Sequence, residues 1–237
     1  MALRHHGSLT VLLLLGLAVA CTATDFDFFY LVLQWPGSYC DTEAGCCFPG
    51  NEKPAADFGI HGLWPNYAAC RPDAVTPNKT SCWPDFCNAT DTLNPSLIRD
   101  LEGDLRRSWG TLSCKRKNSA DFWSHEWSRH GTCSGMGQRA YFRAALELKA
   151  RLDLTGALRD AGITPLDEAE YCLGSVRDAV AAAAGGAAPM VECNRSARNE
   201  TQLYQVYVCV GRDGRALVHC PPPAQRGCTD MVRFPPF

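Results

Sequence analysis

Two periodicities of apolar side chains alternate along this chain, and they predict where strands and helices lie. Strands are predicted where aromatic and β-branched residues run together or alternate with polar ones, at 26–34, 58–63 and 202–210. The last strand meets a Gly-Arg-Asp-Gly turn at 211–214 and resumes at 216–220, which predicts a β-hairpin. The segment at 26–34 is apolar almost throughout, as a strand in the middle of a sheet would be.

Helices are predicted where leucines and aromatic residues recur every three or four positions, at 95–109, 119–129, 140–152 and 167–184. Two glycines at 185–186 would end the last helix. With 237 residues, of which 46% are hydrophobic, the chain is long enough to bury a sizeable core. Because no repeat or linker divides it, we expect one domain that mixes helices and strands.

The N-terminus has the features of an export signal. A basic start precedes an apolar run at 12–20 that is too short to span a bilayer, and small residues follow. Cleavage near Ala20 or Ala23 is expected, which gives a signal peptide at 1–23 and a mature domain at 24–237. An uncleaved membrane anchor is the less favoured alternative because the apolar run is short.

Cysteine content and glycosylation motifs also indicate an exported protein. The 14 cysteines are dispersed along the chain, which favours disulfides over zinc. Asn-x-Ser/Thr sequences occur at Asn78, Asn88, Asn194 and Asn199. Loss of Cys21 with the signal peptide leaves thirteen cysteines, so one thiol is expected to be free or intermolecular. Cys172 is the candidate, as a small buried thiol in the helix predicted at 167–184.

The densest group of reactive side chains lies in FWSHEWSRHGTC at 122–133. His125 and Arg129 are four residues apart there, as are Glu126 and His130, so each pair shares one face of the predicted helix. A formal net charge of −2 excludes a protein that coats nucleic acid through a strongly basic surface. Any polyanion must therefore be held by a local cluster such as this one.

A second segment, FGIHGLWPNY at 58–67, contributes His61 from a predicted strand. Three imidazoles, a carboxylate and a guanidinium are what metal-free cleavage of RNA requires. The ribose 2′-hydroxyl is the nucleophile, one imidazole removes its proton, and another protonates the departing 5′-oxygen. The planar fork of arginine pairs with phosphate oxygens. We therefore predict an enzyme that acts on RNA.

Two other interpretations of these histidines are less favoured. A zinc site of the His-Glu-x-x-His type needs its ligands four residues apart, whereas His125 and His130 are five apart, which separates them by about 140° around a helix. A neighbouring arginine would also repel a dication. A structural role is plausible for any single histidine, but less so for three beside a carboxylate and a guanidinium.

The two histidine segments resemble the signature motifs of the ribonuclease T2 family, in particular its plant S-like branch. DFDFFYLVLQWPGSYC and QLYQVYVCV resemble that branch too, so the resemblance covers nearly the whole mature chain. It implies an α+β fold with a central antiparallel sheet and several helices, stapled by disulfides into a single catalytic domain at 24–237. It also implies cleavage of single-stranded RNA through a 2′,3′-cyclic phosphate, without a cofactor or metal.

The same resemblance implies roles for eight residues. His61 is similar to the proton donor, His130 to the proton acceptor, and Glu126 to the residue that supports the transition state. Substrate contacts are implied for Gln34, Trp64, Phe122, His125 and Arg129. Arg129 departs from the pattern, since the family usually has lysine there, and its longer planar head would shift the phosphate.

Several residues have plainer interpretations. Packing is an equal alternative for Gln34 and Phe122. Trp123 and Trp127 are expected to anchor their helix in the core. His219 lies beside a probable disulfide and is expected to be structural. Base preference is expected to depend on the loop at 112–117.

Disulfides are implied by the family between Cys40–Cys46, Cys47–Cys114, Cys193–Cys228 and Cys209–Cys220. Cys133 would pair with Cys82 or Cys87. Cys70 and Cys172 are extra to that pattern.

The predicted function is that of a secreted or vacuolar endoribonuclease, monomeric and without a membrane attachment in its mature form. A non-catalytic storage or defence glycoprotein of the same fold is the alternative from a different class, and the intact histidine motifs argue against it. A self-incompatibility determinant is disfavoured by a sequence pI of about 6.3, because those relatives tend to be basic.

Overall fold

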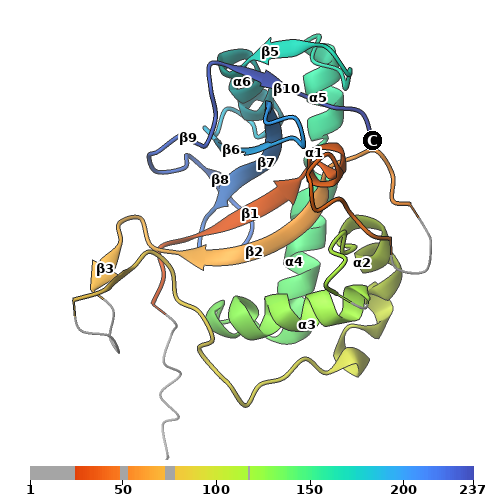
Figure 1. Ribbon diagram of the computed structural model, residues 1–237. Helices are drawn as coiled ribbons and strands as arrows, with labels where there is room; N and C mark the ends of the chain where they lie inside the picture. Colours follow the sequence, from red (N-terminus) through yellow and green to blue (C-terminus); the bar gives the residue numbers. More distant parts are fainter. Residues whose placement is uncertain (1–24, 49–52, 73–77, 117) are drawn as a thin grey trace, which may run out of the picture.

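The computed structural model describes residues 25–48, 53–72, 78–116 and 118–237. The predicted signal peptide at 1–23 lies outside these ranges. A twisted β-sheet occupies the middle of the described part, and helices lie at both of its ends (Figure 1).

The main sheet is made of strands that are far apart in the sequence: β1 (Phe28–Gln34), β2 (Gly59–Asn66), β5 (Glu170–Cys172), β6 (Met190–Arg195), β7 (Thr201–Val210), β8 (Leu217–Val218), β9 (Gln225–Arg226) and β10 (Met231–Arg233). Its central path is β2-β1-β7-β10-β5, while β6 pairs with β7 and β9, and β8 pairs with β7. A separate small sheet pairs β3 (Arg71–Pro72) with β4 (Thr80–Ser81). Among the described strands, only β6–β9 and β7–β10 pair in parallel.

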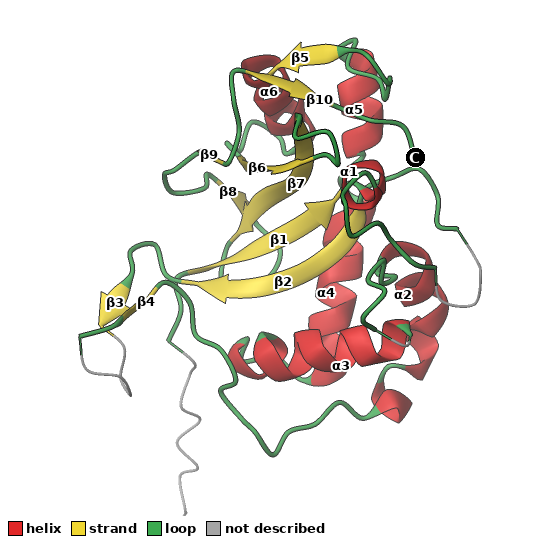
Figure 2. Cartoon of the chain, in the orientation of Figure 1, coloured by secondary structure: helices red, strands yellow, loops and turns green. Residues whose placement is uncertain are grey.

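The α-helices of the described ranges are α1 (Pro36–Cys40), α2 (Glu102–Ser108), α3 (Ser119–Arg129), α4 (Gln138–Ala150), α5 (Leu154–Asp160) and α6 (Leu173–Ala183). In the view of Figures 1 and 2, α2 and α3 lie below β2, and α5 and α6 lie above β1 and β2, beside β5 and β10 of the same sheet. The predicted α+β class is confirmed, with a central sheet that is largely antiparallel.

The position of β1 explains its nearly continuous apolar sequence. It lies between β2 and β7, and both of its faces are covered. Phe29 and Leu31 are fully buried in the main core with side chains of the helices. On the opposite face, Val32 packs with Met190 and Tyr207. The sheet therefore has two apolar faces, of which the helical side is the larger.

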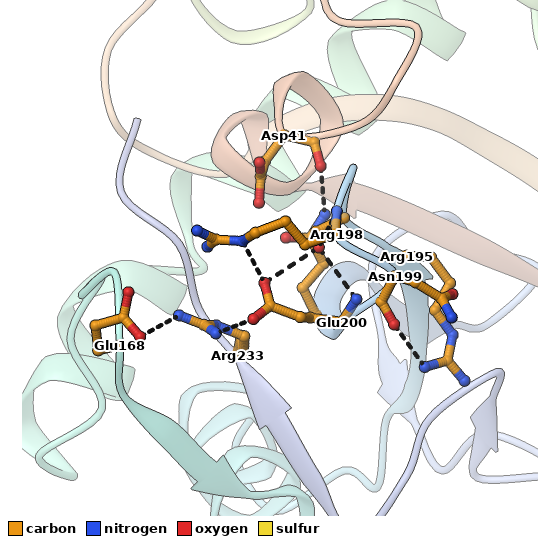
Figure 3. A network of polar contacts seen from close by, with 9 residues as sticks. Asp41, Glu168, Arg195, Arg198, Asn199, Glu200 and Arg233 are labelled. Carbon is orange, nitrogen blue, oxygen red and sulfur yellow. Dashed lines mark hydrogen bonds and ion pairs between the residues drawn. The ribbon is translucent and has the colours of Figure 1, made fainter.

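A network of charges fixes the short strand β10 (Figure 3). The guanidinium of Arg233 contacts the Glu200 carboxylate and lies 3.6 Å from Glu168 Oε2. Arg198 Nε is 3.1 Å from Glu200 Oε2. Because Arg233 is 9% exposed, its charge requires such partners. The pairing of β10 with β7 consists of a single residue pair, Arg233 with Gln202, and the network reinforces it.

Local periodicity predicts α3 at its observed bounds and α4 to within two residues, but it is wrong at 167–184. Glu170–Cys172 forms β5, paired with β10, and α6 begins after it. This pairing with a distant strand overrides the local pattern. Gly185 and Gly186 do follow the helix, with φ of +66° and +91°.

The helix predicted at 95–109 is also interrupted. Two 3-10 turns, Pro95–Leu97 and Arg99–Leu101, precede α2. Leu97 is 50% exposed, whereas Ile98 and Leu105 are buried as the spacing predicts. Three further elements, α1, α5 and β6, are absent from the predicted set, because they are short and lack a clear period.

The described residues contain six disulfides: Cys40–Cys46, Cys47–Cys114, Cys70–Cys82, Cys87–Cys133, Cys193–Cys228 and Cys209–Cys220. Four are those that the resemblance implies, and Cys87 is the partner of Cys133. Cys70, expected outside the pattern, pairs with Cys82. Cys172 is free as predicted, but the expectation of a buried helical thiol is wrong, because it is exposed on β5.

Two disulfides close loops of very different length, and they should contribute differently to stability. Cys47–Cys114 spans 67 residues and Cys209–Cys220 spans 11. Because a longer loop restricts the unfolded chain more, replacing both cysteines by alanine should lower the free energy of unfolding by about 4 kcal/mol for the first pair and about 3 kcal/mol for the second. Denaturant unfolding measures both values, with Cys172→Ala as the neutral control. The reverse order would contradict this account.

Candidate active site

A β-bulge sets the direction of His61 on β2. The register between β1 and β2 shifts between Val32 and Leu33, and His61 is the residue left without a partner. Its carbonyl oxygen accepts a hydrogen bond from Trp109 Nε1 at 2.9 Å instead. Bulges re-aim side chains next to functional sites. The His61 ring lies 5.7 Å from the ring of Phe122 on α3, centroid to centroid.

The helix α3 carries the other histidines and is fixed by two buried tryptophans. Asn118 caps its first turn by accepting a hydrogen bond from a backbone N–H. Trp123 Nε1 donates to the Trp109 carbonyl at 2.7 Å, and Trp127 Nε1 donates to the Asp91 carbonyl at 2.9 Å. The predicted anchoring role of both tryptophans is confirmed, and it leaves the rest of the helix to face β2.

One hydrogen bond joins the strand to the helix. Trp64 Nε1 donates to Glu126 Oε2 at 2.8 Å, and Glu126 is 2% exposed. The His130 ring stacks on Trp64, with centroids 5.0 Å apart and planes 24° apart. A β-carbon at Gly62 would lie 2.0 Å from Trp64 Nε1 and 2.3 Å from Glu126 Oε2. Gly62 therefore leaves the space in which this bond forms.

Two cavities flank the junction, and we name them the Trp64 cavity and the Gln34 cavity. The Trp64 cavity has a volume of about 200 Å³, and among the residues in its wall are Trp64, Arg129 and His130. The Gln34 cavity has a volume of about 210 Å³, and its wall includes Gln34 and Phe122. Both walls contain His61, His125 and Glu126. All eight residues singled out by the sequence thus lie around one divided site.

Burial controls the protonation of Glu126. It raises the pKa of this carboxyl to about 8, although the hydrogen bond from Trp64 and the charges of Arg116 and Arg129 act in the opposite direction. At neutral and acidic pH, Glu126 is therefore a neutral acid. Such a group can donate a hydrogen bond as well as accept one.

Burial has the opposite effect on the imidazoles, since it disfavours their charged form. It lowers the pKa of His61 to about 4, helped by His125 and Arg116, while the hydrogen bond with Gln205 raises it. Burial also holds the pKa of His130 well below its usual range, together with the guanidinium that precedes it in sequence. Within the described residues, His130 Nδ1 is buried without a hydrogen-bond partner.

The guanidinium of Arg129 is only loosely held. Its Nε lies 3.8 Å from Asp85 Oδ2 and forms no hydrogen bond within the described ranges. Its Cζ is 5.9 Å from the centre of the Phe86 ring. The head group can therefore respond to an anion in the Trp64 cavity.

Two residues at the site have no role in the sequence prediction. Arg116 lines the Gln34 cavity, with Cζ 5.7 Å from the centre of the Phe122 ring. The feature of the sequence that could have identified Arg116 is the basic run in the loop at 112–117. Gln205 lies beside His61 and is 3% exposed. The feature of the sequence that could have identified it is a polar residue inside an otherwise apolar strand.

Three further observations define the site's surroundings. The described residues contain no group of three or more histidine, cysteine, aspartate or glutamate side chains placed to hold a metal ion. None of the helices described is long and apolar enough to cross a membrane. A cavity of about 650 Å³ beside Phe237 contains none of the eight residues.

Comparison with known proteins agrees with this fold. Residues 26–220 match the model of the ribonuclease T2 family, and the chain belongs to that family. It is 46% identical to Ribonuclease 1 of Arabidopsis thaliana, over 97% of this chain and 95% of that protein. It is 43% identical to Extracellular ribonuclease LE of Solanum lycopersicum, over 93% and 92% of the two chains.

The solved structures include a similar fold. The structure of RNase NT in complex with 5′-AMP matches with a TM-score of 0.81 and 43% identity, covering 90% of this chain and all of that one. The plant S-like resemblance seen in the sequence is confirmed.

The tight space at Gly62 gives a direct test of the strand–helix junction. Gly62→Ala should displace Trp64 from Glu126 and lower the free energy of unfolding by about 1–3 kcal/mol, as overpacking does. Gly59→Ala on the same strand is the matched control, because its β-carbon would have one neighbour, the Ser108 carbonyl oxygen at 3.6 Å. Denaturant unfolding followed by tryptophan fluorescence compares the two variants. Equal stability would contradict the proposed crowding.

Proposed function

We propose that this chain is an endoribonuclease that cleaves single-stranded RNA by transphosphorylation, leaving a 2′,3′-cyclic phosphate. The observation that supports this most is that the strand histidine, His61, meets residues of α3 and the histidine that follows it, His130, around two adjacent cavities that share three lining residues. Its relatives are named ribonucleases, and a similar solved structure binds 5′-AMP.

The two histidines divide the proton transfers. His130 takes the proton of the 2′-hydroxyl as the 2′-oxygen bonds to phosphorus, and His61 gives a proton to the 5′-oxygen as the phosphorus–oxygen bond breaks. The low pKa of His130 keeps its imidazole neutral, as a base requires. A bound phosphate monoanion raises the pKa of His61 towards the charged form that an acid requires.

Glu126 and the cations stabilise the charge that develops on the phosphate. Trp64 Nε1 donates a hydrogen bond to one oxygen of Glu126. When Glu126 is protonated, it can donate its own proton in a hydrogen bond to a phosphoryl oxygen. Arg129, on the Trp64 side, and Arg116, on the Gln34 side, supply positive charge from opposite walls. His125 lines both cavities, which supports a contact with the phosphate between them.

Two cavities on either side of the phosphate position suit the two nucleosides that flank the cleaved bond. Trp64 in one wall and Phe122 in the other offer aromatic faces to bases. Bases can enter such cavities only when they are unpaired, which favours single-stranded RNA. Gln34 and Phe122 would contact the base or phosphate on their side.

We also propose that residues 1–23 are a signal peptide and that the domain at 24–237 acts as a monomer in an oxidising compartment. Six disulfides among the described residues favour such a compartment. The relatives include an extracellular and an intracellular ribonuclease of Solanum lycopersicum. Secretion and delivery to the vacuole are both consistent with the export signal.

Loss of either transferring histidine should abolish turnover. His61→Ala and His130→Ala should each lower the rate of cleavage of homopolymeric RNA by about 10²- to 10⁴-fold, since each removes one proton transfer. His219→Ala is the control, because that ring only accepts a hydrogen bond from Ala188 N at the surface. EDTA should have no effect, and DNA should not be cut.

Retained activity in either histidine variant would contradict the mechanism. A wild-type protein that binds RNA without cleaving it would favour the non-catalytic alternative.

The pH dependence should follow the protonation of His61. Because this residue must be charged and its pKa in the free site is about 4, kcat/KM should be highest on the acid side of neutrality and fall about tenfold per pH unit above that pKa. The alkaline limb of the kcat profile should lie at higher pH than that of kcat/KM, because the bound phosphate raises the pKa of His61. Rates with a dinucleoside monophosphate measure both profiles. A kcat/KM that is constant from about pH 5 to about pH 8 would contradict the assignment.

A further inference from the structure

A row of polar side chains lies beside His61; its middle member is buried and the two outer ones are half-buried. Gln205 on β7 is paired in register with Gln34 on β1 and with Glu192 on β6. These side chains cross three neighbouring strands on one face of the sheet, next to the bulged residue of β2. Gln205 is the middle member and is 3% exposed.

The Gln205 amide lies among four polar side chains, one of which is Tyr204. In the structure its Nε2 lies 2.7 Å from His61 Nδ1 and donates to Gln34 Oε1 at 3.1 Å, and its Oε1 accepts from the Tyr207 hydroxyl at 2.9 Å. The Tyr207 hydroxyl also contacts the Glu192 carboxylate. Buried groups of this kind need matched donors and acceptors. Since the two ends of an amide have the same shape, the partners' protons decide which end is oxygen.

The decisive group is Tyr207, which has one proton and two neighbours. A carboxylate can only accept, and it accepts more strongly than an amide oxygen, so the phenol donates to Glu192. Burial and Glu192 raise the pKa of Tyr207, which keeps that proton in place. The end of Gln205 that faces Tyr207 must then be the NH₂ group. Its oxygen consequently faces His61 and Gln34.

We propose that Glu192, Tyr207 and Gln205 form a relay that holds His61 with a proton on Nδ1, donated to the Gln205 carbonyl oxygen, and leaves Nε2 for the substrate. Gln34 turns the same way: its Oε1, which in the structure accepts from Tyr204 at 3.2 Å and from Gln205, changes places with its NH₂, which then donates to the oxygens of both residues. Every member of the row then has a matching partner.

Gln205 is then a positioning residue, because it holds His61 in the tautomer that a proton donor needs. This role rests on the proposed ribonuclease reaction. When His61 binds a second proton, the proton enters at Nε2, and the Nδ1–H bond to the carbonyl persists. The relay therefore favours the imidazolium that a proton donor requires. The hydrogen bond raises the pKa of His61, whereas burial of the ring and the positive charges of His125 and Arg116 lower it. The other titratable groups that face the ring, Glu126 and His130, are neutral.

The tautomer of His61 can be measured without any assay of activity. Protein labelled with ¹⁵N at histidine, in long-range ¹H–¹⁵N correlation spectra above the pKa of His61, reports which ring nitrogen carries the proton, and the His61→Ala spectrum assigns the signal. We expect the Nδ1–H form. An Nε2–H form, with Nδ1 accepting from Gln205, overturns the relay whether or not the protein cleaves RNA.

A variant outside the cavities tests the direction of the relay. Glu192→Gln keeps the volume but replaces the carboxylate, so the Tyr207 proton is free to turn to Gln205. We expect a larger Nε2–H fraction of His61 and an alkaline limb of kcat/KM about one pH unit lower, which is about a tenfold loss on that limb. Glu147→Gln, an exposed partner of Arg143 on α4, is the control. An unchanged tautomer ratio in Glu192→Gln overturns the proposed role of Glu192.

Discussion

The hydrogen bond from Trp64 to Glu126 is the interaction on which the rest of the site depends. It joins β2 to α3, two elements whose bonded residues are 62 positions apart in sequence. On one side of it, the β-bulge turns His61 towards the helix, and on the other, His130 stacks on the Trp64 ring. The hydrogen bond itself requires that position 62 has no side chain, because a β-carbon there would lie 2.0 Å from Trp64 Nε1 and 2.3 Å from Glu126 Oε2.

Because the strand and the helix pack closely at this junction, burial is the largest influence on the pKa values of His61, Glu126 and His130. Without a ligand, the site favours a neutral carboxyl at Glu126 and neutral imidazoles at His61 and His130. A phosphodiester brings the negative charge that this arrangement lacks, and it raises the pKa values of the imidazoles. Substrate binding and protonation are therefore coupled. This coupling gives a chain with a formal net charge of −2 a local means of holding RNA.

The sequence was informative wherever the signal is local. The bounds of α3, the hairpin of β7 and β8, and the anchoring tryptophans Trp123 and Trp127 follow from periodicity and turn residues. Five residues of the divided site were found from the chemistry of the two histidine segments, and the motif resemblance added Gln34, Trp64 and Phe122. Features that depend on distant pairing were not: β5 replaces the start of a predicted helix because it pairs with β10, and Cys172 is exposed for the same reason. The bulge at His61 and the contact between Gln205 and His61 arise from strand register, which no local pattern records.

The central claim is that strand and helix hold one phosphodiester between them, and ligand binding tests it most directly. A 2′-deoxy dinucleotide has a phosphodiester but lacks the nucleophile, so it binds without being cleaved. Its titration into protein with ¹⁵N-labelled histidines should shift the ring signals of His61 and His130 together, with one saturation curve and a raised pKa for both. A shift of one ring while the other stays unchanged at saturation would contradict the account.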